Sequence, residues 1–103
     1  MKQKKIRIGQ DNVFSASVDV VARKIEGEMI IIPLTARIGD LEDDLYTLNK
    51  SGQAVWEKLD GERSVHAIVK ELCAEYGAPA DVIQKDVVGI LSELARRGII
   101  VSS

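Results

Sequence analysis

Acid–base, nucleophilic and metal chemistry depends on a few side-chain types, and this chain is poor in them. His66 is the only histidine and Cys73 the only cysteine among 103 residues. Both fall in one predicted helix, where His66 lies off the apolar stripe and Cys73 lies on it. We therefore expect a solvated histidine and a buried thiol, with no catalytic residue and no metal site.

Three further features resemble functional motifs but have simpler explanations. Glu42, Asp43 and Asp44 form an acidic cluster in a polar connection, so we expect a solvated loop rather than an acid–base pair. Trp56 stands at helical spacing in an apolar stripe, which is typical of a core anchor. The glycines mark turns and element ends rather than a phosphate loop. No cofactor is expected.

Composition narrows the class of protein. Hydrophobic residues make up 46% and charged residues 29% of the chain, which is typical of one globular domain. The net charge of -2 and the pI near 5.4 argue against nucleic acid as a partner. No apolar run is long enough to span a bilayer and the start lacks a secretory signal, so we expect no membrane segment and a cytoplasmic location. The single cysteine agrees with a reducing compartment.

The first residues differ in character from the rest. Residues 1–12 carry Lys2, Lys4, Lys5 and Arg7 with little apolar content. Such a segment is either a flexible basic tail or a basic arm that touches a partner. The folded domain is therefore predicted to span residues 13–103.

Three β-prone segments come next, at residues 18–25, 28–34 and 43–48. Glu26 and Gly27 suit a hairpin turn between the first two. Three amphipathic helices follow, and the apolar residues 99–101 are expected to pack back against the sheet or the helices. The prediction is an α+β fold in which a three-stranded antiparallel sheet precedes a three-helix bundle.

The helix boundaries are indicated by capping residues. The first helix is expected to begin at either Asn49 or Ser51, directly after the third strand, and to end before Asp60 and Gly61. The second helix is expected to begin at a cap at Ser64 and to end at Gly77. The third is expected to begin near Pro79 and to end at Gly98. A cap at Asn49 would join strand and helix rigidly.

Two stretches, "LNKSGQAVWEKLDGERSVHAIVKEL" and "DVVGILSELARRGII", carry a set of motifs spread over five elements. They include the Leu-Asn-x-Ser-Gly start of the first helix, the Leu-Asp-Gly turn and the Gly-Ile-Ile end of the third helix. Together they resemble the family of coenzyme PQQ synthesis protein D, the PqqD-like domains. The resemblance covers residues 45–101 well and the earlier strands only by pattern.

This resemblance implies a winged-helix-like fold and a non-catalytic peptide-binding module. Such domains capture the leader segment of a ribosomally made precursor peptide in a groove between the third strand and the third helix. They present it to a modifying enzyme, commonly a radical SAM enzyme, in PQQ or other peptide biosynthesis. The peptide-binding residues expected from this are Leu45, Tyr46, Thr47, Leu48, Lys85, Val88 and Ser92.

Some alternatives stay open from the sequence. Val88 is an apolar residue off the core stripe, so it either packs on the sheet or lines the groove. A winged-helix DNA-binding protein would use Lys85, Arg96 and Arg97 on the third helix, although Asp86 and Glu93 share that helix. A third alternative is a structural subunit that forms a homodimer through the exposed sheet edge.

Overall fold

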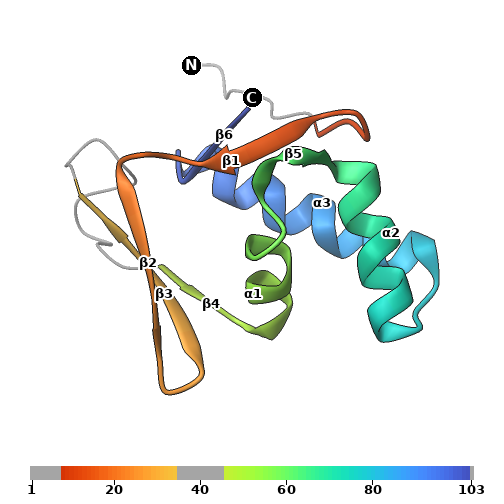
Figure 1. The fold of residues 1–103 in the computed structure, drawn as a ribbon, viewed down its shortest axis with the longest axis horizontal. Coiled ribbons are helices and arrows are strands. Elements are labelled where there is room, and N and C mark those ends of the chain that lie inside the picture. The colour runs from red at the N-terminus through yellow and green to blue at the C-terminus, as the bar shows by residue number, and fades with distance from the viewer. Residues whose placement is uncertain (1–7, 35–45, 103) are drawn as a thin grey trace, which may run out of the picture.

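A computed structural model describes residues 8–34 and 46–102 of the chain. Two three-stranded antiparallel sheets and three helices make up this part of the protein (Figure 1). In chain order the elements are β1 (Val13–Ala16), β2 (Val20–Ile25), β3 (Glu28–Pro33), β4 (Tyr46–Leu48), α1 (Lys50–Trp56), β5 (Asp60–Ser64), α2 (Val65–Tyr76), α3 (Ala80–Arg96) and β6 (Ile100–Ser102).

The predicted α+β class is confirmed, and the predicted sheet is the one with strand order β2-β3-β4. Its hairpin turns at Glu26 and Gly27, both of which have positive φ (52° and 86°). Two successive positive φ values match the twist of the flanking strands, which is why this turn closes a tight hairpin. Residues 43–45 of the predicted third strand lie outside the described residues, and β4 is described from Tyr46 onward.

The second sheet, with order β5-β1-β6, was not predicted as a sheet. The first helix ends at Trp56 rather than running to Asp60, and Asp60 begins β5. The predicted return of residues 99–101 to the body of the protein is confirmed, because β6 pairs with β1 and Ile99 and Ile100 are buried. Each of these strands finds its partners far along the chain, so local sequence patterns carry little trace of them.

The caps that begin α1 and α2 and the glycine that ends α2 lie at expected positions. Asn49, not Ser51, caps α1, since its Oδ1 accepts a hydrogen bond from the Gly52 backbone N–H at 2.8 Å. Ser64 Oγ accepts from the Ala67 N–H at 3.2 Å and caps α2, which Gly77 ends in the left-handed conformation with φ 66°. These local signals are strong because they satisfy helix-end groups directly.

The core lies between the three helices and one face of each sheet. Among the described residues, fifteen apolar side chains form one cluster, which includes Phe14 on β1, Ile31 on β3 and Leu91 on α3, the last with no exposed surface. Trp56 and Cys73 are half-buried and pack against this cluster, while His66 is exposed. The predicted roles of Trp56 as a core anchor and of His66 as a surface residue agree with these positions.

Of the predicted basic tail, residues 1–7 lie outside the described residues. In the described remainder, Gln10 and Asn12 are hydrogen-bonded to helix residues. The carbonyl of Asn12 accepts from the Val65 N–H at 2.9 Å, and that of Gln10 accepts from the His66 N–H at 3.0 Å. Residues 10–12 are thus held against the start of α2.

Candidate functional site

Strand β4 forms one edge of the β2-β3-β4 sheet. Met29, Ile30 and Ile31 of β3 face Leu48, Thr47 and Tyr46 on one side, and no described strand pairs with the other side. In an antiparallel pair, alternate residues direct their N–H and C=O groups away from the partner strand. The outer side of β4 therefore offers main-chain groups to an additional strand.

The side chains of β4 point alternately to the two faces of the sheet. Leu48 belongs to the core with only 4% of its surface exposed, and Tyr46 on the same face is half-buried. Thr47 points to the opposite face and is exposed. Of the predicted binding residues on this strand, Leu48 can offer only its main chain, and Leu45 lies outside the described residues.

The junction between β4 and α1 is tightly packed. A Cβ atom on Gly52 would lie 3.0 Å from Leu48 Cδ2 and 3.2 Å from Leu48 Cβ, so no larger residue fits without movement. The Gln53 side-chain amide bridges two carbonyls, donating to Gly27 at 3.0 Å and to Leu48 at 3.3 Å. Together with the Asn49 cap, these contacts fix the direction of β4 relative to the helices.

The far end of β4 is tied to the end of α3. The guanidinium carbon of Arg97 lies 4.5 Å from the centre of the Tyr46 ring, within the range of a cation–π interaction. Arg97 Nε also donates to Glu93 at 2.5 Å, and Arg96 pairs with the same carboxylate. The hydrogen bond from Arg97, and then that from Arg96, lowers the pKa of Glu93. Both arginines that a DNA-binding function would need are therefore engaged by an acidic neighbour.

Four side chains define the edge of α3 on the side of Tyr46. Asp86, Ile90, Glu93 and Arg97 are spaced at four, three and four residues, so they follow one line along the helix; we call this line the groove flank. β4 and the groove flank meet where Tyr46 contacts Arg97, and Ser51 of α1, three residues after the end of β4 at Leu48, shares a pocket with Asp86 and Ile90 at the other end of the flank. The space between them is the candidate site.

The predicted α3 residues lie elsewhere on the helix. Lys85 and Val88 line a shallow hollow with Asp81 and Gln84, and the Gln84 side chain accepts from Gln10 at 3.2 Å. Val88 and Arg97 are separated by about two and a half helical turns, so they project from opposite sides of α3. Ser92 is half-buried. The structure thus brings Tyr46 together with Arg97 of the groove flank, whereas Lys85 and Val88 line the hollow on another side of α3.

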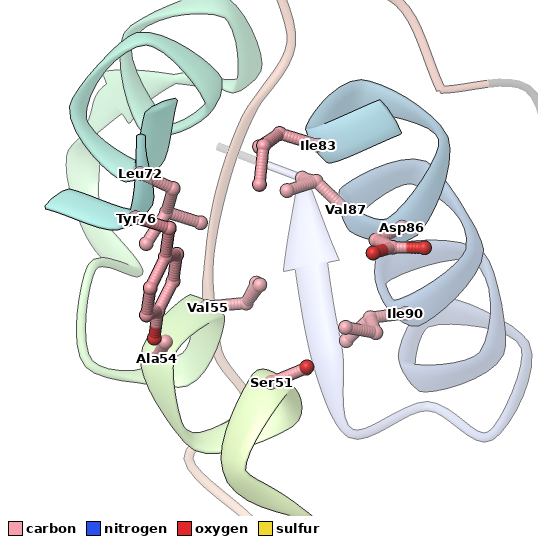
Figure 2. A pocket seen from close by; sticks show the side chains of 9 residues that line it. All are labelled: Ser51, Ala54, Val55, Leu72, Tyr76, Ile83, Asp86, Val87 and Ile90. Atoms are coloured by element: carbon pink, nitrogen blue, oxygen red, sulfur yellow. The ribbon is translucent and has the colours of Figure 1, made fainter. Parts of the chain in front are cut away.

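A small pocket opens between the three helices (Figure 2). It has a volume of about 60 Å³. Figure 2 shows Tyr76 of α2 on one side, Ile90 and Asp86 of α3 on the other, and Val55 of α1 between them. We call it the helix pocket, and its full lining is Ser51, Ala54, Val55, Leu72, Tyr76, Ile83, Asp86, Val87 and Ile90.

Sequence reasoning missed the groove flank and the helix pocket for the same reason. The repeat of Asp86, Ile90, Glu93 and Arg97 is visible in the sequence as one line on a helix. Which side of the helix faces β4, however, is decided by packing between distant segments. The only sequence signal available was that Arg97 and Tyr46 are a cation and an aromatic ring, a pairing too common to be diagnostic.

The described part of the chain shows no site for metal chemistry. Within residues 8–34 and 46–102, no group of three or more His, Cys, Asp and Glu side chains could hold a metal ion. Nor does any helix described there have the length and apolarity needed to cross a membrane. What the arrangement offers is a surface of main-chain donors and acceptors beside apolar and charged side chains.

Part of the chain is similar in sequence to a known binding protein. The sequence is 48% identical over 42 residues to a PqqA binding protein from Gluconobacter oxydans (strain 621H), a match that covers 41% of this chain and 44% of that protein. The chain thus spans less than half the length of this curated relative.

Two solved structures have the same fold. One is the solution structure of the PqqD truncation of Methylobacterium extorquens PqqCD, described as a stand-alone recognition element for ribosomally synthesized and post-translationally modified peptides. It has a TM-score of 0.73 and 20% identity, and the match covers 92% of this chain and 95% of that one. The other is TbiB1 in complex with the TbiA(beta) leader peptide, with a TM-score of 0.69 and 23% identity over 84% of this chain and 93% of that one.

The family described as coenzyme PQQ synthesis protein D (PqqD) matches residues 36–100, well over half of the chain. The match includes β4, all three helices and the beginning of β6. On this ground the chain belongs to the family of coenzyme PQQ synthesis protein D.

Proposed function

We propose that this protein binds the leader segment of a ribosomally made precursor peptide and presents it to a modifying enzyme, in PQQ or a related peptide pathway. The peptide adds to β4 as one more strand and lies between β4 and the groove flank. Family membership supports this proposal, as do the relative described as a PqqA binding protein and the neighbour solved with a leader peptide. The modifying enzyme is proposed to be of the radical SAM class.

The observation that carries the proposal is the contrast between the two edges of one sheet. Strand β2, at one edge, has Arg23 and Lys24, and such charges discourage pairing with a further strand. Strand β4, at the other edge, is the uncharged sequence Tyr-Thr-Leu. The uncharged edge is the one joined to α1 through the Asn49 cap and contacted by Arg97 at the end of α3, and it is suited to strand addition.

The two walls of the groove have different tasks in this proposal. Main-chain bonds from β4 hold a peptide of almost any sequence, because every residue except proline has the same donor and acceptor. Selectivity comes from side chains, and the groove flank supplies an apolar group in Ile90 and charged groups at Asp86, Glu93 and Arg97. Lys85, Val88 and Ser92 remain predicted contacts, reached only by a peptide that crosses over α3.

An NMR titration tests the proposal. The ¹⁵N-labelled protein would be mixed with synthetic PqqA and with leader portions of the precursor peptides encoded in its own genome. We expect shifts at the amides of Tyr46, Thr47 and Leu48, and slower hydrogen exchange at whichever of them points outward. Shifts confined to the hollow around Lys85 and Val88, or steep salt-dependent binding to duplex DNA with none at β4, would contradict it.

A further inference from the structure

The helix pocket takes no part in strand addition. Its position beyond the end of β4, however, places it where a peptide bound to β4 would continue. We propose that it is a side-chain subsite for the same peptide, which takes an aliphatic residue whose neighbour is basic. This inference rests on the proposed function. It adds a sequence requirement that binding to the β4 edge alone does not impose.

The size and lining of the helix pocket select an aliphatic group. Its deep walls are the buried core residues Val55, Leu72 and Val87, with Ala54 and Ile90 nearer the opening. The volume of about 60 Å³ is well below the roughly 150 Å³ of a cavity that accepts a benzene ring. The branched end of a leucine, isoleucine or valine side chain can therefore enter, whereas an aromatic ring needs the pocket to widen.

The opening of the helix pocket carries the negative charge of Asp86, with which no described residue forms an ion pair. Asp86 is exposed at the rim, and among the residues described it forms no ion pair, whereas Glu93 on the same flank is bound by two arginines. The other rim residues, Ser51 and Tyr76, are uncharged. A lysine or arginine next to the inserted aliphatic residue would place its cation beside Asp86.

The path from β4 to the helix pocket is short enough for one peptide. Asp86 and Arg97 are eleven residues apart on α3, which at 1.5 Å per residue is about 16 Å. An extended peptide covers that distance in about five residues at roughly 3.3 Å each. A segment that pairs with β4 beside Tyr46 and Arg97 and continues past the start of α1 therefore reaches the pocket within the length of a leader motif.

The test begins by selecting peptides that bind the protein. Random 15-residue peptides displayed on phage would be selected on the immobilised full chain, and the enriched peptides synthesised. We expect an aliphatic residue with an adjacent lysine or arginine, about five positions from the part that protects the β4 amides. Three variants then measure its role: Ala54→Leu fills the pocket, Asp86→Asn removes the rim charge, and Asp81→Asn removes a carboxylate from the same helix outside the pocket.

The affinities of these variants separate the possible outcomes. Ala54→Leu should weaken binding about tenfold or more, the equivalent of losing one buried aliphatic side chain. Asp86→Asn should weaken it about two- to fivefold, as an exposed ion pair does, and Asp81→Asn should leave it unchanged. Replacing the aliphatic residue of the peptide by alanine should cost affinity with the wild-type protein and little with Ala54→Leu.

Failure of the inference differs from failure of the proposed function. Peptides that protect the β4 amides but bind Ala54→Leu and Asp86→Asn as tightly as wild type would overturn the subsite and leave strand addition intact. Enriched peptides that leave the β4 amides unaffected, or no enrichment at all, would overturn the proposed function and the subsite with it. If Ala54→Leu proves unfolded in its ¹⁵N spectrum, the exposed Asp86→Asn variant and the peptide substitution still decide the question.

Discussion

The two sheets of this protein are attached to the helices in very different ways. Sheet β5-β1-β6 is continuous with them, because β5 leads directly into α2 at Ser64, and the Ser17 N–H donates to the Ile99 carbonyl at 2.8 Å just before β6. Sheet β2-β3-β4 uses one face of β3 for the core, while β2 is largely exposed, with 50% of Ile25 accessible. Figure 1 shows the β2–β3 hairpin extending away from the helices.

On the proposed function, this difference assigns stability to one sheet and peptide binding to the other. In sheet β5-β1-β6, which we call the integrated sheet, the edge strand β5 continues directly into α2 and the edge strand β6 follows closely after α3. Sheet β2-β3-β4, the projecting sheet, meets the helices through the buried face of β3 and through β4, where Asn49, Gly52 and the contact of Arg97 with Tyr46 lie. Changes in the first sheet should therefore affect folding, and changes around β4 should affect the groove.

The largest expected effect is in the integrated sheet. Phe14→Ala removes a ring that is 6% exposed at the centre of that sheet, and it should lower the free energy of unfolding by about 3–5 kcal/mol. Val21→Ala in β2, where the side chain is 37% exposed, should change it by no more than about 0.5 kcal/mol. Denaturant unfolding measures both, and equal losses would show that the two sheets are equally integrated.

Removing the helix cap next to β4 should have the second largest effect. Asn49→Ala deletes the acceptor for the Gly52 N–H and should cost about 0.5–2 kcal/mol in the free energy of unfolding. Peptide affinity should fall only as far as the groove loosens. Ser51→Ala is the matched control, because Ser51 was the alternative cap and should be close to neutral. A larger loss at Ser51 than at Asn49 would show that the cap is wrongly assigned.

Alanine substitutions at two helical glycines test the packing of the junction between β4 and α1: Gly52 lies at the junction, and Gly89 on α3 serves as the control. At Gly89 a Cβ meets nothing within 4 Å, so Gly89→Ala should stabilise α3 by about 0.5–1 kcal/mol. At Gly52 the same change brings the new Cβ against Leu48, and the crowding should outweigh that gain, for a net loss of about 1 kcal/mol. Thermal melts of both variants provide the comparison, and a stabilised Gly52→Ala would mean that β4 can shift freely.

The smallest change in stability is expected at the end of the groove. Arg97→Gln removes the cation from the Tyr46 ring and should lower the free energy of unfolding by about 0.5–1 kcal/mol, with clear NMR shifts of the Tyr46 ring protons. Arg96→Gln also removes a partner of Glu93, but no contact of Arg96 with Tyr46 is described, so the ring should be unaffected. Similar shifts in both variants would mean that the ring responds to charge alone.

Acid should weaken the contact between Arg97 and the Tyr46 ring. Because the pKa of Glu93 lies below its ordinary value of 4.5 in the folded protein, its ion pairs stabilise the fold above pH 4.5 and are lost as the pH falls through the lowered pKa. Arg97 is then less restrained, and the Tyr46 ring protons should shift in that range. Arg97→Gln should greatly reduce this titration, and a full titration in the variant would assign it to another carboxylate.

Local signals made most of the fold predictable. The hairpin turn, the caps at Asn49 and Ser64 and the glycine end of α2 each depend on residues within a few positions of one another. Strands β1, β5 and β6 did not show in the sequence, since they are three to five residues long and β5, with the sequence DGERS, has no apolar alternation. Their pairing depends on contacts across most of the chain.

The candidate site was predictable only in outline. The edge position of β4 followed from the order of the strands, whereas the face of α3 turned toward it did not. Val88 was the apolar residue outside the core stripe, and it lies with Gln84 on the side away from Tyr46. Both flanks of α3 border the same apolar stripe, so the periodicity that marks the stripe does not tell which flank faces β4.

The close contact between Leu48 and Gly52 has a practical consequence for redesign. It fixes the backbone of the groove through residues whose side chains face the core or the helix turn, not the proposed peptide. Thr47, Ala54 and Asp86, which border the groove or the helix pocket, take no part in that junction. Retargeting the protein to a new peptide can therefore randomise these three positions while residues 48–52 are kept as an unchanging frame.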